Sequence, residues 1–257
     1  MTESLSLYRT PTVFESFPAL VAAESTRHGG VSPFPFTSLN VGINTDDLPE
    51  HVEENRRRFF SSLRIDPARV ASSYQVHGDR ILTVTNPGRF DGFDALITNR
   101  PDQFLTVTVA DCTPILLYDS GQQAVAAIHA GWRGTVARIV EKTVRAMQAE
   151  FGTRPADCFA YVGTCIDECS FEVGPEVADQ FGDADKRFDA GRQKYFINLK
   201  TANAAQLAAA GIPGHQIGVS PYSTVLHNQD YFSYRIENGK TGRMLALIGI
   251  RSPGTAR

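Results

Sequence analysis

Long apolar runs, a strong net charge and a secretion signal are all missing from this 257-residue chain. No apolar run reaches the roughly 20 residues that a membrane span requires. The N-terminus has neither the basic start nor the continuous apolar stretch of a signal peptide. The formal net charge of −3 gives no reason to expect nucleic acid or an anionic membrane as a partner. We therefore expect a soluble, cytoplasmic protein.

Cysteine is also scarce, and no two of the four cysteines form a C-x-x-C pair. In a cytosolic chain of this size we expect the thiols to stay reduced, which excludes a disulfide scaffold. Hydrophobic residues make up 42% and charged residues 21% of the chain, which is ordinary globular usage. Because there is no linker, repeat or low-complexity tract, we expect residues 1–257 to form one domain.

Hydrophobic patterning predicts many short strands and a few long helices. Runs rich in apolar and β-branched residues predict strands near 12–17, 20–26, 69–76, 81–86, 94–98, 104–110, 114–118, 123–129, 158–163, 215–220 and 243–250. Helices are predicted at 50–63, at 134–151, after Gly174-Pro175 and at 199–210. Because these elements do not alternate regularly, we expect an α+β fold with a large mixed or antiparallel sheet rather than a doubly wound sheet.

Three potential metal ligands stand where predicted strands end in turns. His77 precedes a glycine, Cys112 follows the strand near 104–110, and His129 opens a glycine-rich turn before the clearest predicted helix. Zinc accepts imidazole and thiolate ligands, and three protein ligands leave an open position for catalysis. The spacings match no local zinc motif, so a buried cysteine and hydrogen-bonded histidines remain alternative roles for these residues.

A second interpretation uses the same side chains without a metal. Cys112 would be a nucleophile and His129 or His77 its base, with Asp111 as an orienting or proton-carrying group. Strand alternation would point Asp111 away from the Cys112 side chain, which counts against the proton-carrying role. Arg27 lies in a Gly-Gly turn that is compatible with an anion site and with a solvated loop.

Nine segments in this order resemble the YfiH family, which carries laccase-domain, purine nucleoside phosphorylase and peptidoglycan-editing labels. They are Ser25–Ser32, Ser38–Gly42, Gln75–Gly78, Asp94–Thr98, Ala110–Pro114, His129–Gly134, Gly163–Gly174, Phe232–Arg235 and Thr241–Arg243. The resemblance implies a four-layered α/β/β/α sandwich, with zinc ligands at His77, Cys112 and His129. One departure is Ser223-Thr224, where family members often have Cys-Thr, and it leaves the three ligands intact.

The resemblance also implies an activity and a substrate site. Family members are described as phosphorolysing adenosine, inosine, guanosine and methylthioadenosine, and as deaminating adenosine. A monomer that binds a purine nucleoside and phosphate is therefore expected. Arg27, Asn40 and Arg133 are the residues that the resemblance suggests for binding phosphate or sugar.

The labels that the family carries leave a choice of metal and of reaction. Zinc is the expected metal and copper the alternative. A four-copper laccase is excluded, because six histidines without a His-x-His pair are too few imidazoles to hold four copper ions. The alternative function is an amidohydrolase that removes a wrong amino acid from a nucleotide-linked cell-wall precursor. A non-catalytic metal-binding module is a third possibility, although structural zinc sites are normally closed by four ligands.

Overall fold

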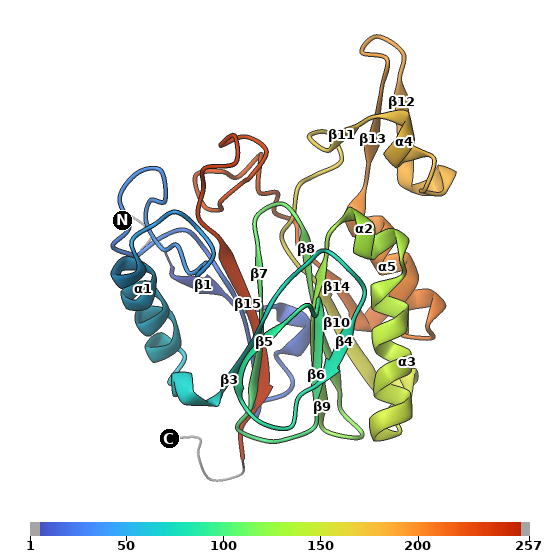
Figure 1. Ribbon diagram of the computed structural model, residues 1–257. Helices are drawn as coiled ribbons and strands as arrows, with labels where there is room; N and C mark the ends of the chain where they lie inside the picture. The colour runs from blue at the N-terminus through green and yellow to red at the C-terminus, as the bar shows by residue number, and fades with distance from the viewer. Residues whose placement is uncertain (1–5, 253–257) are drawn as a thin grey trace.

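Two six-stranded sheets form the body of the computed structural model, which describes residues 6–252 (Figure 1). The first sheet has the strand order β1 (Tyr8–Arg9), β2 (Leu20–Ser25), β15 (Met244–Ile250), β7 (Phe104–Val109), β3 (Val70–Tyr74) and β5 (Gly88–Asp91). The second has the order β14 (Ile217–Val219), β10 (Cys158–Val162), β8 (Thr113–Asp119), β9 (Ala124–Ala130), β6 (Ala95–Thr98) and β4 (Ile81–Thr83). Both sheets combine parallel and antiparallel pairs, so the prediction of mixed pairing is confirmed, over two large sheets rather than one.

Helices cover the outer faces of both large sheets (Figure 1). Helix α1 (Pro49–Ser62) packs on the first sheet through Phe59 and Phe60. Helices α3 (Ile139–Phe151) and α5 (Leu199–Ala209) pack on the second sheet. The elements therefore lie in the order helix, sheet, sheet, helices, and the α+β prediction is confirmed. None of the helices within residues 6–252 is both long and apolar enough to cross a membrane.

The central strands bury both of their faces. In β8, Leu116 and Tyr118 point into the core between the sheets, whereas Ile115 and Leu117 pack beneath α3 and α5. Full burial of such an aliphatic side chain contributes roughly 1.5–3 kcal/mol. This two-sided burial explains why these strands read in the sequence as nearly continuous apolar runs.

A small third sheet stands out from the end of the body that carries α2 (Trp132–Val136) (Figure 1). Its strands lie in the order β11 (Glu172–Val173), β13 (Lys194–Ile197) and β12 (Lys186–Asp189), next to the one-turn helix α4 (Pro175–Ala178). The helix after Gly174-Pro175 is the one that the sequence predicts. The sheet itself was not predicted, because its strands are short and few of their side chains are fully buried.

The strand predicted at 12–17 is wrong. That segment forms a single 3-10 turn, Thr12–Phe14, which places Phe14 in the core between the large sheets. Pro11 and Pro18 bracket the segment, and prolines lack the N–H groups that a strand ladder uses. Further 3-10 turns span Pro67–Arg69, Pro155–Asp157, Asp183–Asp185 and Gly214–Gln216.

The helix predicted at 134–151 is divided into α2 and α3. The break lies at Arg138, whose φ of 61° is left-handed. A continuous helix would use the Thr135 carbonyl for the N–H four residues on, but here it accepts a hydrogen bond from Nε2 of Gln206 at 2.7 Å. Gly152 ends α3 with φ 73°, as the sequence predicts. The break separates α2, whose Trp132 and Arg133 line the cavity described below, from α3.

Candidate metal centre

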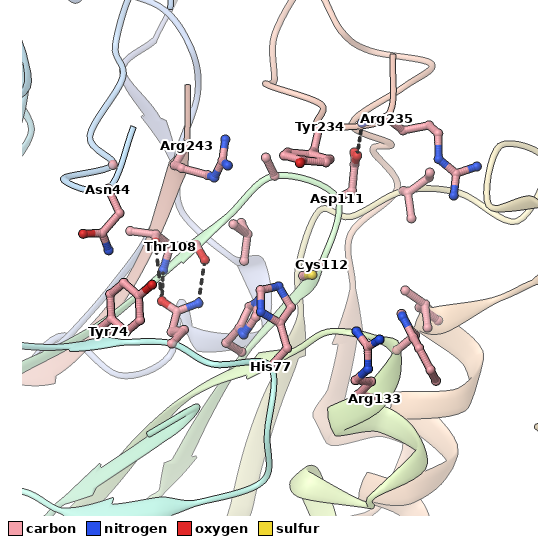
Figure 2. A pocket seen from close by; sticks show the side chains of 18 of the residues that line it. Asn44, Tyr74, His77, Thr108, Asp111, Cys112, Arg133, Tyr234, Arg235 and Arg243 are labelled. Carbon is pink, nitrogen blue, oxygen red and sulfur yellow. Dashed lines mark hydrogen bonds between the residues drawn. The ribbon is translucent and has the colours of Figure 1, made fainter. Parts of the chain in front are cut away.

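His77, Cys112 and His129 converge beside a cavity at one end of the two sheets (Figure 2). Their ligand atoms all lie within 4.8 Å of one another. Within residues 6–252 this is the only group of three or more His, Cys, Asp or Glu side chains close enough to share a metal ion. The structure therefore brings together the three ligands that the sequence singles out.

The register of strands β8 and β9 places two of the three candidate ligands next to each other. Cys112 immediately precedes β8, and His129 lies on the neighbouring strand β9, opposite Pro114. His77 follows β3 of the other sheet and has a left-handed φ of 59°. A Cβ on Gly131 would lie 3.1 Å from both Cys112 Sγ and His77 Cδ2. Glycine at position 131 thus lets the thiol and the imidazole approach the same point.

The buried carboxylate of Asp94 organises both histidines. It accepts backbone hydrogen bonds from Val76 (3.2 Å), His77 (2.9 Å) and Gly78 (2.8 Å), and it lies 2.8 Å from His129 Nδ1. A carboxylate on one ring nitrogen fixes the tautomer and turns the other nitrogen toward the ligand. Sequence reasoning missed this role, although an isolated aspartate directly before the largely apolar strand Ala95–Thr98 was a usable signal.

Contact among the three candidate ligands shifts the pKa values of Cys112 and His129. Burial by itself raises the pKa of the Cys112 thiol, but the imidazoles of His129 and His77 outweigh burial and lower this pKa to about 6. Burial likewise lowers the pKa of His129, but the Cys112 thiolate and Asp94 together raise it to about 9. These contacts favour the thiolate of Cys112, the form that binds metals and that attacks as a nucleophile.

The donor set fits a catalytic zinc site. Two imidazoles and one thiolate are borderline-soft ligands of the kind zinc prefers, and three protein ligands leave room for a substrate atom. The Asp94 carboxylate on His129 Nδ1 matches the support that metal-binding histidines usually receive. His77 is exposed and Cys112 half-buried, so the ligand atoms can be reached from the cavity.

The cavity has a volume of about 580 Å³, which is within the range of small-molecule sites. Arg243, Asn44 and Tyr74 line it on one side of the three ligands, and Arg133 lies on the opposite side (Figure 2). Tyr234 lies over the ligands, near the Asp111 side chain (Figure 2). A small molecule in the cavity would therefore meet cationic and aromatic groups on both sides of the candidate metal centre.

Arg133 is the only one of the three predicted substrate-binding residues that lines the cavity. It is exposed, and its guanidinium lies 4.4 Å from the ring centre of Trp132. Arg27 lies elsewhere, where it pairs with Glu237 at 3.0 Å and donates to the backbone carbonyl of Asn228. Arg27 thus ties two loops together rather than facing the cavity.

Asn40 is fully buried and also lies outside the cavity lining. Its Nδ2 donates to the side chains of Thr45 and Asp47, each at 2.9 Å. Its Oδ1 accepts from the backbone N–H groups of Gly42 and Arg243. The residue that reaches the cavity from this region is therefore Arg243, which sequence reasoning missed although it ends one of the segments shared with the YfiH family.

Asp111 lines the cavity, but hydrogen-bond donors from the 224–235 segment engage its carboxylate. It accepts from the hydroxyls of Thr224 (2.5 Å) and Ser233 (2.8 Å) and from the backbone N–H of Arg235 (2.7 Å). These contacts hold the segment that carries Tyr234 against the turn before β8 (Figure 2). The structure thus gives Asp111 a positioning contact, and the proton-carrying role stays a prediction.

Comparisons with known proteins agree over nearly the whole chain. The family model described as multi-copper polyphenol oxidoreductase laccase matches residues 21–251. A purine nucleoside phosphorylase of Bacteroides thetaiotaomicron is 36% identical over 96% of this chain and 94% of its own length. The purine nucleoside phosphorylase YfiH of Escherichia coli is 37% identical over 89% of this chain and 93% of its own. The crystal structure of YlmD from Geobacillus stearothermophilus matches with a TM-score of 0.91 at 33% identity, covering 97% of this chain and 98% of that one.

Proposed function

This chain belongs to the family described as multi-copper polyphenol oxidoreductase laccase, and from that premise we propose that it is a zinc-dependent purine nucleoside phosphorylase. The observation that carries the proposal is the convergence of His77, Cys112 and His129 on a cavity flanked by arginine and aromatic side chains. The names of the relatives support the same reaction class. The proposed substrates are adenosine, inosine, guanosine and methylthioadenosine, with deamination of adenosine as a second activity.

The reaction needs an anion, a nucleoside and a way to stabilise developing charge. In phosphorolysis an oxygen of phosphate bonds to the anomeric carbon while the bond from that carbon to the purine nitrogen breaks. The electron pair leaves with the purine, which takes up a proton, and ribose 1-phosphate remains. A zinc ion held by His77, Cys112 and His129 would supply Lewis acidity toward a substrate oxygen. Copper is the alternative metal.

The side chains of this protein would bind and orient the two substrates. An arginine of the cavity lining would balance the charge of phosphate, since guanidinium groups recognise phosphate through paired hydrogen bonds. Trp132 and Tyr234 offer aromatic faces on which a purine can stack. Asp94 would hold the His129 ring in one tautomer throughout the cycle.

The donors available do not support the oxidase chemistry that the family description names. Four copper ions need several clusters of imidazoles, and residues 6–252 contain one group of three potential ligands. Of the other histidines, His28 contacts Asp230 and His51 contacts Asp47, far from that group in the sequence. The donor chemistry therefore favours a single metal ion.

One observation also favours a second function. A thiolate at Cys112 beside the His129 imidazole is the pair that a cysteine-dependent amidohydrolase uses. The corresponding activity would be removal of a wrong amino acid from a nucleotide-linked cell-wall precursor. Release of a free amino acid, rather than a free purine, would distinguish it.

Product analysis of the zinc-loaded protein with adenosine, with and without phosphate, tests these proposals. Adenine and ribose 1-phosphate that form only with phosphate would establish phosphorolysis. Inosine that forms without phosphate would establish deamination. If adenosine survives both incubations, the nucleoside proposal is contradicted, and the amidohydrolase becomes the function to assay.

A further inference from the structure

Arg243 is a partly buried cation that faces the cavity. Its Nη1 donates to the carbonyls of Thr241 (2.9 Å) and Gly242 (3.0 Å), and no carboxylate of residues 6–252 forms an ion pair with it. Burial lowers the pKa of Arg243, whereas the more distant Tyr234, Cys112 and Asp111 raise it, and a guanidinium stays charged in proteins. A partly desolvated guanidinium that has no ion pair within contact distance gains when an anion in the cavity joins it.

The other cations that line the cavity are placed differently. Arg235 is exposed, and both of its terminal nitrogens already donate to the carbonyl of Glu172. Arg133 is exposed too, and its guanidinium stacks on the Trp132 ring. Exposed charges are screened by solvent, whereas a partly buried charge is screened less and acts more strongly on a ligand in the cavity. Arg243 is therefore the strongest candidate for holding a small anion.

The backbone at 40–42 is built around the base of Arg243. Asn40 Oδ1 accepts from the Arg243 N–H at 2.9 Å, and the Val41 N–H donates to the Arg243 carbonyl at 3.2 Å. At Gly42 a Cβ would lie 2.6 Å from Arg243 Cγ and 2.8 Å from its Cβ. Only glycine leaves space there for the arginine side chain to pass toward the cavity.

Aromatic contact fixes the far end of the same side chain. The Arg243 guanidinium carbon lies 5.5 Å from the ring centre of Tyr234, within the range of a cation–π interaction. Asn44 and Tyr74 lie on the same side of the cavity and add polar side-chain groups (Figure 2). The guanidinium is thus held in place before any ligand arrives, which lowers the entropy cost of binding.

We propose that Arg243 binds the phosphate co-substrate, and that Asn40 and Gly42 are positioning residues that hold Arg243 in the cavity. This inference rests on the proposed phosphorylase function. It assigns phosphate to the side of the metal centre that carries Arg243. It leaves the opposite side, where Trp132 and Arg133 lie, for the purine (Figure 2).

Steady-state kinetics of zinc-loaded variants test the assignment. Arg243→Met should raise the KM for phosphate about 10- to 100-fold, the loss expected for hydrogen bonds to a charged group. The KM for inosine should change less than about 3-fold. Arg133→Met, the matched change on the opposite side, should show the reverse pattern. Arg145→Met, on the exposed face of α3, should change neither constant.

Gly42→Ala separates positioning from direct contact. Alanine would displace Arg243 without removing its charge, so the KM for phosphate should rise while the KM for inosine stays within about 3-fold.

If Arg243→Met folds poorly, judged by its thermal transition, Arg243→Lys serves as the second variant. Lysine keeps the aliphatic stem and the charge but loses the paired N–H donors of the guanidinium. It should then raise the KM for phosphate alone. An unchanged KM for phosphate, or an equal rise for both substrates, would overturn the inference.

Calorimetric titration with inorganic phosphate distinguishes this inference from the proposed function. If the wild-type protein binds phosphate, Arg243→Met weakens binding at least about 10-fold, and no nucleoside is cleaved, the phosphate site stands and the phosphorylase proposal fails. If nucleosides are cleaved and Arg243→Met keeps the wild-type affinity for phosphate, the phosphate site fails and the activity stands. A wild-type protein that neither binds phosphate nor cleaves nucleosides contradicts both.

Discussion

The Asp94 carboxylate lies 2.8 Å from Nδ1 of His129 while it accepts the backbone N–H groups on both sides of His77. One fully buried side chain therefore orients two of the three proposed metal ligands. The histidines come from different sheets, since His129 lies on β9 and His77 follows β3. Asp94 thus joins the two halves of the site at the point where the metal would bind.

Replacing Asp94 by Asn should weaken zinc binding about 10- to 100-fold, the usual effect of removing a supporting carboxylate. Asparagine would keep the shape of the side chain. Its NH₂ group, however, would face a donor such as the Gly78 backbone N–H, which donates to a carboxylate oxygen of Asp94 in the wild type. Zinc affinity measured by competition with a chelator checks this without relying on activity. Asp157→Asn, at an exposed ion pair, serves as the control. Wild-type affinity in the Asp94 variant would show that the carboxylate is only structural.

Cys112→Ala should abolish zinc binding and turnover together, because the thiolate is one of only three proposed protein ligands. We expect kcat/KM to fall by more than about 100-fold, beyond the effect of losing a supporting residue. Bound zinc, far-ultraviolet circular dichroism and product formation are measured on the same sample. Cys169→Ala, at an exposed thiol, is the control. Full activity in the Cys112 variant would contradict the zinc proposal.

Asp111→Asn should raise the KM for nucleoside roughly 10-fold, because an amide cannot accept all three hydrogen bonds that hold the segment carrying Tyr234. Asparagine tolerates the left-handed φ of 85° at this position, so the backbone should persist. If Asp111 instead carries a proton during catalysis, the Asp111→Asn substitution should lower kcat and remove one limb of the pH profile of kcat. Measuring KM and kcat across pH for this variant and for Asp91→Asn, an exposed control, separates the two roles.

Glu24→Gln should change how stability depends on pH. Burial raises the pKa of Glu24 above its ordinary value of 4.5, although Thr164 and Tyr161 donate hydrogen bonds to it. A carboxyl with a raised pKa contributes stability that is fully present below its unfolded pKa and is lost as pH rises through its folded pKa. The wild-type protein should therefore lose stability relative to Glu24→Gln as pH rises above about 4.5.

Urea unfolding of both proteins at pH 5 and pH 8 measures this difference. We expect the free energy of unfolding of Glu24→Gln minus that of the wild type to be larger at pH 8 than at pH 5, which means that the variant gains relative stability as pH rises. Glu150→Gln, at an exposed position, should show no such trend. A constant difference between wild type and Glu24→Gln would mean that Glu24 keeps the same protonation state in the folded and unfolded chains.

Local patterns in the sequence determined most of the central strands and the ends of several helices. Strands such as β8 and β9 bury both faces, so their apolar runs are visible without knowledge of their neighbours. Gly152 ends its helix because glycine takes up a left-handed conformation freely. The three proposed ligands could also be predicted from the sequence, because histidine and cysteine at the ends of predicted strands are common functional side chains.

Tertiary structure alone decided which polar groups meet. Asp94 lies 17 residues from His77 and 35 from His129 in the sequence, and no local pattern relates the three. Asn40 and Arg243 are 203 residues apart, and no local pattern predicts that the Asn40 side chain accepts the backbone N–H of Arg243. Short-range propensities act through a few neighbouring residues, whereas these hydrogen bonds exist only after two sheets have packed and fixed their register.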